Sequence, residues 1–248
     1  LPARPGRILL VGIGPGDRAD MTPRAIDALD QADVVLGYRR YLEQIEDLLV
    51  GKRVIPRELT KERERAEQTV ELALKGKTVA LVSSGDSGIY GMAGLVFEIL
   101  AERKWDSKEG AQVEVVPGIT ALSACAALLG APLMHDFAVI SLSDLLTPWP
   151  VIKQRLEAAA QADFVLGLYN PKSSRRATQF EEACSLLLRY RSGQTPVGLV
   201  RRAGRPGCRT TITTLAQLPA CEVDMETMIL IGNTQTKLVG DRMVTPRG

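Results

Sequence analysis

The sequence predicts an α/β protein built from two α/β domains, and three features of the chain lead to this expectation. Short apolar segments that suit buried strands alternate with helical segments, the pattern of a parallel sheet covered by helices. In the second half, the threonine-rich run 210–214 favours antiparallel pairing. Residues 130–136 interrupt the alternation and form a candidate linker. We therefore expect a domain with a mainly parallel sheet at 1–131 and a domain with a mixed sheet at 132–248.

The elements of the first domain follow from apolar periodicity and turn residues. Thr22 and Pro23 predict a helix start, because a threonine hydroxyl caps a helix and proline suits its first position. Lys61–Lys75 places apolar residues at helical spacing against a charged face. Strands are expected at 7–12, 32–37, 51–56, 79–82 and 113–116, and helices at 22–32, 38–49, 61–75, 92–102 and 121–129.

The second domain shows the same alternation with fewer helices. Strands are expected at 137–142, 163–168, 195–200, 209–213 and 228–232, helices at 148–160 and 174–190, and a short turn at 215–218.

Composition excludes several classes of function. The apolar fraction of 45% is typical of a globular protein, and a net charge of +2 gives no electrostatic reason to expect nucleic acid. No apolar run approaches the ~20 residues that cross a bilayer, and no signal-peptide pattern precedes the first strand, so we expect a cytoplasmic protein without a membrane partner. His135 is the single histidine, so neither a histidine metal cluster nor a Ser-His-Asp triad is expected, and no metal site is predicted. Cys125 and Cys184 suit core positions.

The glycine-rich segment after the fourth strand is the strongest local signal of a binding site. Gly85, Gly88 and Gly91 let the backbone turn sharply and let a ligand approach main-chain atoms. Asp86 is its one charge, and the carboxyl edge of a parallel sheet is where ligands collect. Without a lysine, the segment favours a cationic or hydroxyl-rich ligand over a phosphate. The alternative is a tight turn in which Asp86 only caps a helix.

The loop Gly12–Asp17 resembles a dinucleotide fingerprint but breaks it. Asp17 stands where that fingerprint needs glycine, and Pro15 lacks an N–H that would face pyrophosphate. This argues against a nucleotide-dependent oxidoreductase, and the loop is expected to line a cleft.

Other strand ends also carry polar groups. Thr120 opens a helix, Tyr169 and Asn170 end a strand before Pro171, and Gly232–Thr236 ends the last strand. We expect these five strand ends, from both halves, to meet in an active-site cleft between the domains.

Basic residues cluster beside these loops and suit a substrate with several carboxylates, which arginine binds with two hydrogen bonds. About half of them have a simpler explanation as solvated surface charges. The candidates for substrate binding are Arg39, Lys61, Arg175 and Arg201.

Four segments resemble the tetrapyrrole methylases, the class III S-adenosylmethionine methyltransferases: Val11–Asp17, Ser83–Met92, Val115–Ser123 and Thr245–Gly248. The stretch Gly130–Trp149 is similar to the branch of that family that methylates C17 of the macrocycle, and Leu168–Pro171 and Thr195–Gly198 support this. The resemblance covers nearly the whole chain.

The resemblance implies S-adenosylmethionine bound in the cleft between two α/β domains, S-adenosylhomocysteine as product, and a homodimer. It implies methyl transfer to C17 of the tetrapyrrole precorrin-3B with ring contraction, in cobalamin biosynthesis. The alternatives are methylation of another corrinoid position, a cobalt-containing precorrin as substrate, or a non-catalytic ligand-binding protein. RNA methylation is disfavoured by the weak net charge.

Carried over by position, the resemblance assigns cofactor contacts to both halves. They are Pro15, Ser84, Gly85, Asp86, Ile89, Thr120, Ala121, Tyr169, Asn170 and Ala203, with Gly232, Asn233 and Thr234 near them. The sequence departs from the family pattern at Leu59, where methionine is expected, at Arg202, where asparagine is expected, and at Cys208, which replaces an acidic residue.

The chemistry fits these residue types. A sulfonium methyl is already electrophilic, so the protein mainly positions the attacking carbon, whereas ring contraction needs an acid or base. The candidates are Asp17, Asp86, Asp144 and Tyr38. We expect Asp17 to line the macrocycle side and Asp86 mainly to shape the cofactor loop.

Overall fold

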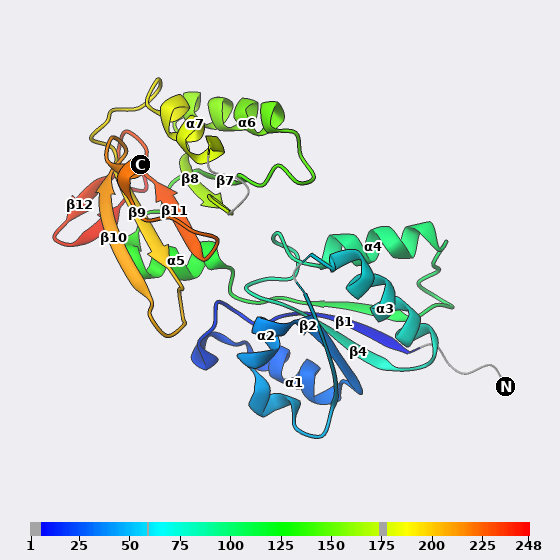
Figure 1. Ribbon diagram of the computed structural model, residues 1–248. Coiled ribbons are helices and arrows are strands. Elements are labelled where there is room, and N and C mark those ends of the chain that lie inside the picture. Colours follow the sequence, from blue (N-terminus) through cyan, green and yellow to red (C-terminus); the bar gives the residue numbers. More distant parts are fainter. Residues whose placement is uncertain (1–5, 59, 174–177) are drawn as a thin grey trace. The chain divides into compact units, whose positions relative to one another are not determined.

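The computed structural model describes residues 6–58, 60–173 and 178–248 (Figure 1). The chain divides into two compact units, Leu1–Ala121 and Leu122–Gly248. The boundary predicted after residue 131 remains a prediction; in this division most of helix α5 belongs to the second unit.

The first unit has the predicted parallel sheet, and helices cover both of its faces. Its strand order is β3-β2-β4-β1-β5, and every pairing is parallel, with Ile8 opposite both Val79 and Val113. The strands are β1 (Arg7–Gly12), β2 (Val34–Tyr38), β3 (Arg53–Arg57), β4 (Thr78–Ser83) and β5 (Gln112–Val116). The helices are α1 (Pro23–Gln31), α2 (Arg39–Glu43), α3 (Glu62–Leu74) and α4 (Ala93–Glu102), with short 3-10 helices η1 (Arg18–Asp20) and η2 (Glu46–Leu49).

Alternate residues of strand β1 belong to two different hydrophobic cores. Ile8 and Leu10 pack with residues of α3 and α4, while Leu9 and Val11 pack with residues of α1, α2 and η2, in agreement with the two helix layers in Figure 1. This is the pattern of a strand buried on both faces. The sequence-based helix start is confirmed: the Thr22 hydroxyl accepts a hydrogen bond from the Ala25 N–H at 3.1 Å.

The prediction of a single helix at 38–49 is wrong, because the segment forms the helix α2 and then the 3-10 helix η2. Leu42, Ile45 and Leu49 still pack into one core, so their spacing is satisfied without a continuous helix. Neither short element has a side-chain cap, and helices of this length are marginal by themselves. Packing against the sheet therefore decides the local conformation.

The second unit has the predicted mixed sheet, in the order β10-β9-β11-β8-β7. Only β7 and β8 pair in parallel; β8–β11, β11–β9 and β9–β10 are antiparallel. The strands are β7 (Phe137–Ser141), β8 (Val165–Tyr169), β9 (Pro196–Arg201), β10 (Arg209–Thr214) and β11 (Thr227–Ile231). The helices are α5 (Ala121–Leu129), α6 (Trp149–Gln161), α7 (Thr178–Leu187) and the 3-10 helix η3 (Leu218–Ala220).

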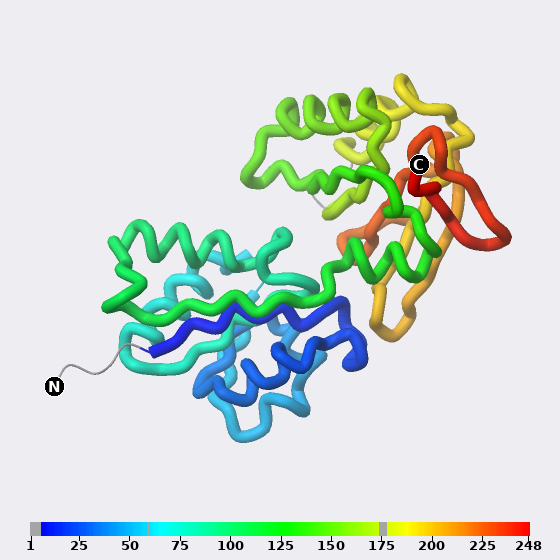
Figure 2. The backbone as a smooth tube through the Cα atoms, turned by 180° about the vertical axis from the view of Figure 1, so that it is seen from behind, coloured from blue at the N-terminus to red at the C-terminus, as the bar shows by residue number. Residues whose placement is uncertain are grey.

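The two faces of this sheet carry different helices. Residues of α6 and α7 pack on one face, and α5 packs on the other against Val200, Met228 and Leu230 (Figure 2). Glycines in the strands allow α5 to lie close: a Cβ at Gly167 would be 2.6 Å from a Leu122 methyl, and one at Gly198 would be 2.4 Å from a Leu129 methyl.

A small third sheet includes the first two residues of the linker expected at 130–136. Strand β6 (Gly130–Ala131) pairs in parallel with β13 (Arg242–Val244), which pairs antiparallel with β12 (Lys237–Val239). The sequence did not predict this sheet, because strands of two or three residues carry no alternating pattern. Within the described residues, no helix has the length and apolar character that a membrane crossing requires.

Candidate functional site

Three loops of the first unit meet at the carboxyl edge of its sheet, and glycines make this approach possible. The Gly14 N–H donates to the Gly85 carbonyl at 3.0 Å, and the Gly85 N–H donates to the Gly14 carbonyl at 2.7 Å. A Cβ at Gly118 would be 2.2 Å from the Gly85 oxygen, and one at Gly12 would be 2.7 Å from the same oxygen. The loops after β1, β4 and β5 are therefore held backbone to backbone.

Asp86 links two of these loops through its side chain. Its Oδ1 accepts a hydrogen bond from the Gly88 N–H at 2.7 Å, and its Oδ2 accepts one from the Gly118 N–H at 3.0 Å. Helix α4 begins later, with Met92 at its N-cap position, so Asp86 does not cap that helix. With both oxygens bonded to backbone groups, Asp86 can fix the loop geometry without a bound ligand.

The loop cluster contains the predicted cofactor residues of the first unit. Pro15 follows Gly14 and is buried, whereas Ile89, in the loop after β4, is 43% exposed. A Cβ at Gly85 would lie 3.6 Å from the Ala121 N and 3.7 Å from the Thr120 Cα. Residues Pro15, Ser84, Gly85, Asp86, Ile89, Thr120 and Ala121 thus belong to the three adjoining loops.

The acid–base candidates of the first unit have different surroundings. Asp17 is exposed at the start of η1, where its Oδ1 accepts from the Ala19 N–H at 2.8 Å. Tyr38 ends β2 and stacks edge-to-face on Tyr41, with ring centroids 5.1 Å apart. Near these tyrosines lies Arg65, which is 3% exposed; burial lowers its pKa, and electrostatic interaction, chiefly with Glu62, opposes that shift.

Sequence reasoning counted Arg65 only among the basic residues beside the loops and missed its burial. Its Nη1 donates to the Glu58 carbonyl at 2.7 Å and its Nη2 to the Met92 sulfur at 3.6 Å. The helical position of Arg65 one residue before Ala66, on the apolar side of α3, was the available signal.

Acidic side chains lie beside three of the four basic residues predicted to bind substrate, Arg39, Lys61 and Arg201. Arg39 lies 3.8 Å from Glu58, and Lys61 lies 2.5 Å from Glu64. These pairs are exposed, and exposed ion pairs contribute only about 0–1 kcal/mol, so a substrate carboxylate could replace the partner. Arg175 lies outside the described residues.

In the second unit, Tyr169 and Asn170 are fixed at the end of β8. The Tyr169 hydroxyl accepts from the Leu122 N–H at 3.0 Å, at the start of α5. Asn170 adopts φ of 50°, a left-handed conformation that asparagine tolerates better than most residues, and its Nδ2 donates to the Ser141 hydroxyl at 3.0 Å. The ends of β7 and β8 are therefore tied together.

The end of β9 lies at the same edge, because β8 and β9 both run antiparallel to β11. Ala203 and Tyr169 pack against the same apolar cluster. Arg202 adopts φ of 56°, and its Nε donates to Glu226 at 2.7 Å. The structure thus brings Tyr169, Asn170 and Ala203 to one edge of the sheet.

Arg201 pairs with acidic residues at the start of β11. Its Nε lies 2.7 Å from Asp224, and its Nη1 lies 3.6 Å from Glu222. Burial raises the pKa of Asp224, but hydrogen bonds from Thr227, Arg201 and the Glu226 N–H outweigh it, so the net pKa lies below the ordinary value. Sequence reasoning missed this acidic segment, because its place at the edge depends on the direction of β11.

The expectation that the end of the last strand joins the other strand ends is wrong for Gly232, Asn233 and Thr234. Strand β11 is antiparallel to β8, so its end lies beside the start of β8. There Arg191 donates to the Gly232 carbonyl at 2.5 Å and also to the Phe164 carbonyl, and the Thr234 N–H donates to Asp163 at 3.1 Å. These residues lie at the opposite edge of the sheet from Tyr169.

Asp144 lies in the loop after β7, where its Oδ2 accepts from the Gln179 Nε2 at 2.9 Å. This bond joins the loop to α7. Asp144 is thus at the same edge as Tyr169, and its Oδ2 is held by the hydrogen bond from Gln179.

Comparison with known proteins identifies the family. Residues 7–219 match the family model of the Tetrapyrrole (Corrin/Porphyrin) Methylases. The chain belongs to this family. Members of the family use S-adenosylmethionine, so S-adenosylmethionine is the cofactor of this methylase.

Two relatives show how closely the chain resembles known members. It is 49% identical over 243 residues to the cobalt-factor III methyltransferase of Priestia megaterium, covering 98% of this chain and 45% of the relative. It is 48% identical over 239 residues to the probable cobalt-factor III C(17)-methyltransferase of Salmonella typhimurium, covering 96% of this chain and 98% of that protein. The methylase thus spans less than half of the first relative and nearly all of the second.

Solved structures agree with this assignment. The crystal structure of the methyltransferase CobJ superimposes with a TM-score of 0.92 at 35% identity, over 97% of this chain and 100% of that one. Uroporphyrin-III C-methyltransferase from Thermus thermophilus, complexed with S-adenosyl homocysteine, gives a TM-score of 0.71 at 26% identity, over 92% and 97% of the two chains.

Proposed function

We propose that this methylase transfers a methyl group from S-adenosylmethionine to C17 of a cobalamin-pathway tetrapyrrole, with contraction of the ring. Cobalt-factor III, named in the relatives, is the first candidate substrate, and metal-free precorrin-3B is the second. The observation that carries the proposal is the identity of 48–49% with proteins of that name over nearly the whole chain.

The residues present suit the cofactor. Bound S-adenosylmethionine supplies a methyl group on a positively charged sulfur; the ring carbon forms the new bond, and the sulfur leaves with the electron pair. Gly12 and Gly118 let the three loops pack backbone against backbone, and these adjoining loops supply a carboxylate at Asp86 and no lysine. We propose that these loops, with Tyr169, Asn170 and Ala203 of the second unit, bind the cofactor.

Proton transfer during ring contraction is assigned first to Asp17. Asp86 has both oxygens in backbone hydrogen bonds and Asp144 has one in a bond to Gln179, whereas Asp17 is exposed and bonds one N–H of its own turn. Tyr38, near the buried cation of Arg65, is the alternative.

The Asp17→Asn variant tests this assignment, because asparagine keeps an oxygen for the Ala19 N–H. Turnover should fall by about 100-fold or more, the usual contribution of a general acid or base, with unchanged affinity for S-adenosylmethionine. Asp47→Asn, at an exposed acid that pairs with Arg18 at 3.7 Å, is the matched control. Wild-type turnover by Asp17→Asn would remove Asp17 from the mechanism.

The central experiment incubates the protein with cobalt-factor III and isotope-labelled S-adenosylmethionine. Mass spectrometry should show the gain of one labelled methyl group, and the absorbance spectrum should report the contraction. A methyl group at another ring position would support the second candidate function, favoured by the likeness to cobalt precorrin-4 methyltransferase at a TM-score of 0.71 and 26% identity. Binding without methyl transfer would indicate a non-catalytic protein.

We also propose that the protein acts as a homodimer. Light scattering of the purified chain should give twice the mass of 26.9 kDa, and a monomer that turns over at the full rate would contradict this.

A further inference from the structure

Two leucines in the loop between β7 and α6 are almost fully exposed. Leu145 is 79% exposed, and Leu146, at 94%, is the most exposed large apolar side chain in the part of the chain that the structure describes. Burying a leucine stabilises a protein or complex by about 1.5–3 kcal/mol. Leu145 and Leu146 are exposed, so they do not contribute this free energy to the fold. The loop is therefore a candidate contact for an apolar ligand surface.

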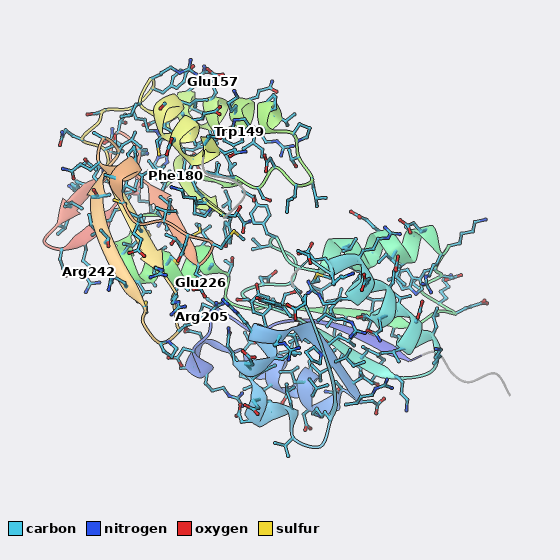
Figure 3. All side chains as sticks on the ribbon, viewed as in Figure 1. Trp149, Glu157, Phe180, Arg205, Glu226 and Arg242 are labelled. Atoms are coloured by element: carbon cyan, nitrogen blue, oxygen red, sulfur yellow. The ribbon has the colours of Figure 1, made fainter. Side chains whose placement is uncertain are left out.

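The loop is anchored on both sides of these leucines. Before them, the Leu142 N–H donates to the Tyr169 carbonyl at 2.9 Å, and Asp144 accepts from Gln179 at 2.9 Å. After them, the Trp149 Nε1 donates to Glu182 of α7 at 2.8 Å, and Trp149 is marked at the start of α6 in Figure 3. These hydrogen bonds fix the loop on both sides of Leu145 and Leu146, which remain exposed.

Hydrogen bonds also connect this loop to the edge of the sheet that carries the proposed cofactor residues of this unit. The Ser141 hydroxyl, at the end of β7, accepts from Asn170, and the Leu142 N–H bonds the carbonyl of Tyr169. A group that contacts Leu145 and Leu146 therefore lies on the same side of the sheet as Tyr169 and Asn170.

We infer that Leu145 and Leu146 contact the apolar ring face of the tetrapyrrole and position it for methyl transfer; this rests on the proposed function. A tetrapyrrole has a broad apolar face and a rim of carboxylates. The loop offers two consecutive, exposed apolar side chains that suit this face. The leucines are substrate-positioning residues and take no part in proton transfer.

The test is the double variant Leu145→Asn/Leu146→Asn, assayed with cobalt-factor III. Its KM should rise about tenfold or more, since the loss of even one buried leucine contact is equivalent to about a tenfold change in binding. The Kd for S-adenosylmethionine should stay within about twofold. The variant Leu145→Met/Leu146→Met should keep near wild-type values, because methionine preserves the apolar surface.

Val50→Asn is the matched control. Val50 is 83% exposed but lies before β3, at the amino edge of the first sheet, opposite the glycine loops of that unit. This variant should leave both constants unchanged.

A binding measurement without turnover gives an independent readout. In a Trp105→Phe background, Trp149 is the remaining tryptophan of the two, and it lies three residues after Leu146. Cobalt-factor III should quench its fluorescence, and the asparagine double variant should need about tenfold more ligand for half of this effect.

The outcomes separate this inference from the proposed function. Unchanged KM and unchanged quenching in the double variant would overturn the leucine contact while wild-type methyl transfer still supports the function. A change of oligomeric state in the double variant, with ligand binding intact, would assign the leucines to a protein interface instead. Wild-type protein that methylates no tetrapyrrole would refute the proposed function itself.

Discussion

The two units build their candidate site residues by different means. In the first unit, glycines 12, 14, 85 and 118 bring three strand-end loops into backbone contact, and Asp86 holds two of the loops through backbone N–H groups. In the second unit, side chains make the connections: Asn170 to Ser141, Arg202 to Glu226 and Arg201 to Asp224. The first arrangement should tolerate almost no added atom, whereas the second should tolerate exchanges of similar side chains.

The largest expected effect is that of Gly118→Ala. The added Cβ would lie 2.2 Å from the Gly85 oxygen and 2.6 Å from the Gly12 oxygen, so backbone must move. Urea unfolding should show destabilisation by about 3 kcal/mol, at the upper end of overpacking effects, and S-adenosylmethionine binding should be lost.

Gly94→Ala is the control for this change. Nothing lies within 4 Å of a Cβ at Gly94, in helix α4, so the variant should be stabilised by up to about 1 kcal/mol. Equal stability of Gly118→Ala and wild type would show that the loops are not held as close as described.

Asp86→Ala should have an intermediate effect. It removes two hydrogen bonds between backbone N–H groups and a carboxylate, which should lower stability by about 2–3 kcal/mol and weaken S-adenosylmethionine binding. Calorimetric titration and urea unfolding measure the two effects.

Asp17→Ala serves as the comparison, because this exposed residue loses one hydrogen bond and should cost about 1 kcal/mol or less. If Asp86→Ala proved no more harmful than Asp17→Ala, the bridge between the two loops would carry little stability.

The smallest effect is expected for Arg202→Asn in the second unit. Asparagine fits φ of 56° better than arginine, with a gain of about 1 kcal/mol, while the lost ion pair with Glu226 costs up to about 1 kcal/mol (Figure 3 marks Glu226). The net change in unfolding free energy should be below about 1 kcal/mol.

The Glu226→Gln background separates the two contributions. There the ion pair is already absent, so Arg202→Asn should stabilise by about 1 kcal/mol, whereas Arg202→Lys should give no gain because it keeps the strained backbone. Destabilisation by Arg202→Asn in this background would mean that the backbone at this position stores no strain.

The direction of the strands in each sheet explains which parts of the candidate site could be predicted from the sequence. In a parallel sheet every strand ends at the same edge, so the loops at Pro15, Ser84–Asp86 and Thr120 could be grouped from their order along the chain. In the mixed sheet the same reasoning failed for Gly232–Thr234, because β11 runs the other way. Arg65 was missed for a different reason: its place beside Ala66 on the apolar side of α3 indicated burial, but charged residues of a polar helix are usually exposed.

By itself, the sequence determined the alternation of strands and helices, the parallel first sheet and the mixed second sheet, because periodicity and turn residues act locally. Membership of a methylase family followed from the resemblance of four segments to that family. Only the tertiary structure decided which loops touch, that Asp86 bridges two of them, that the end of β11 lies away from Tyr169, and that Leu145 and Leu146 are exposed. Those properties depend on contacts between residues far apart in the chain. Whether two strands pair in parallel or antiparallel cannot be recognised from the sequence of either strand alone.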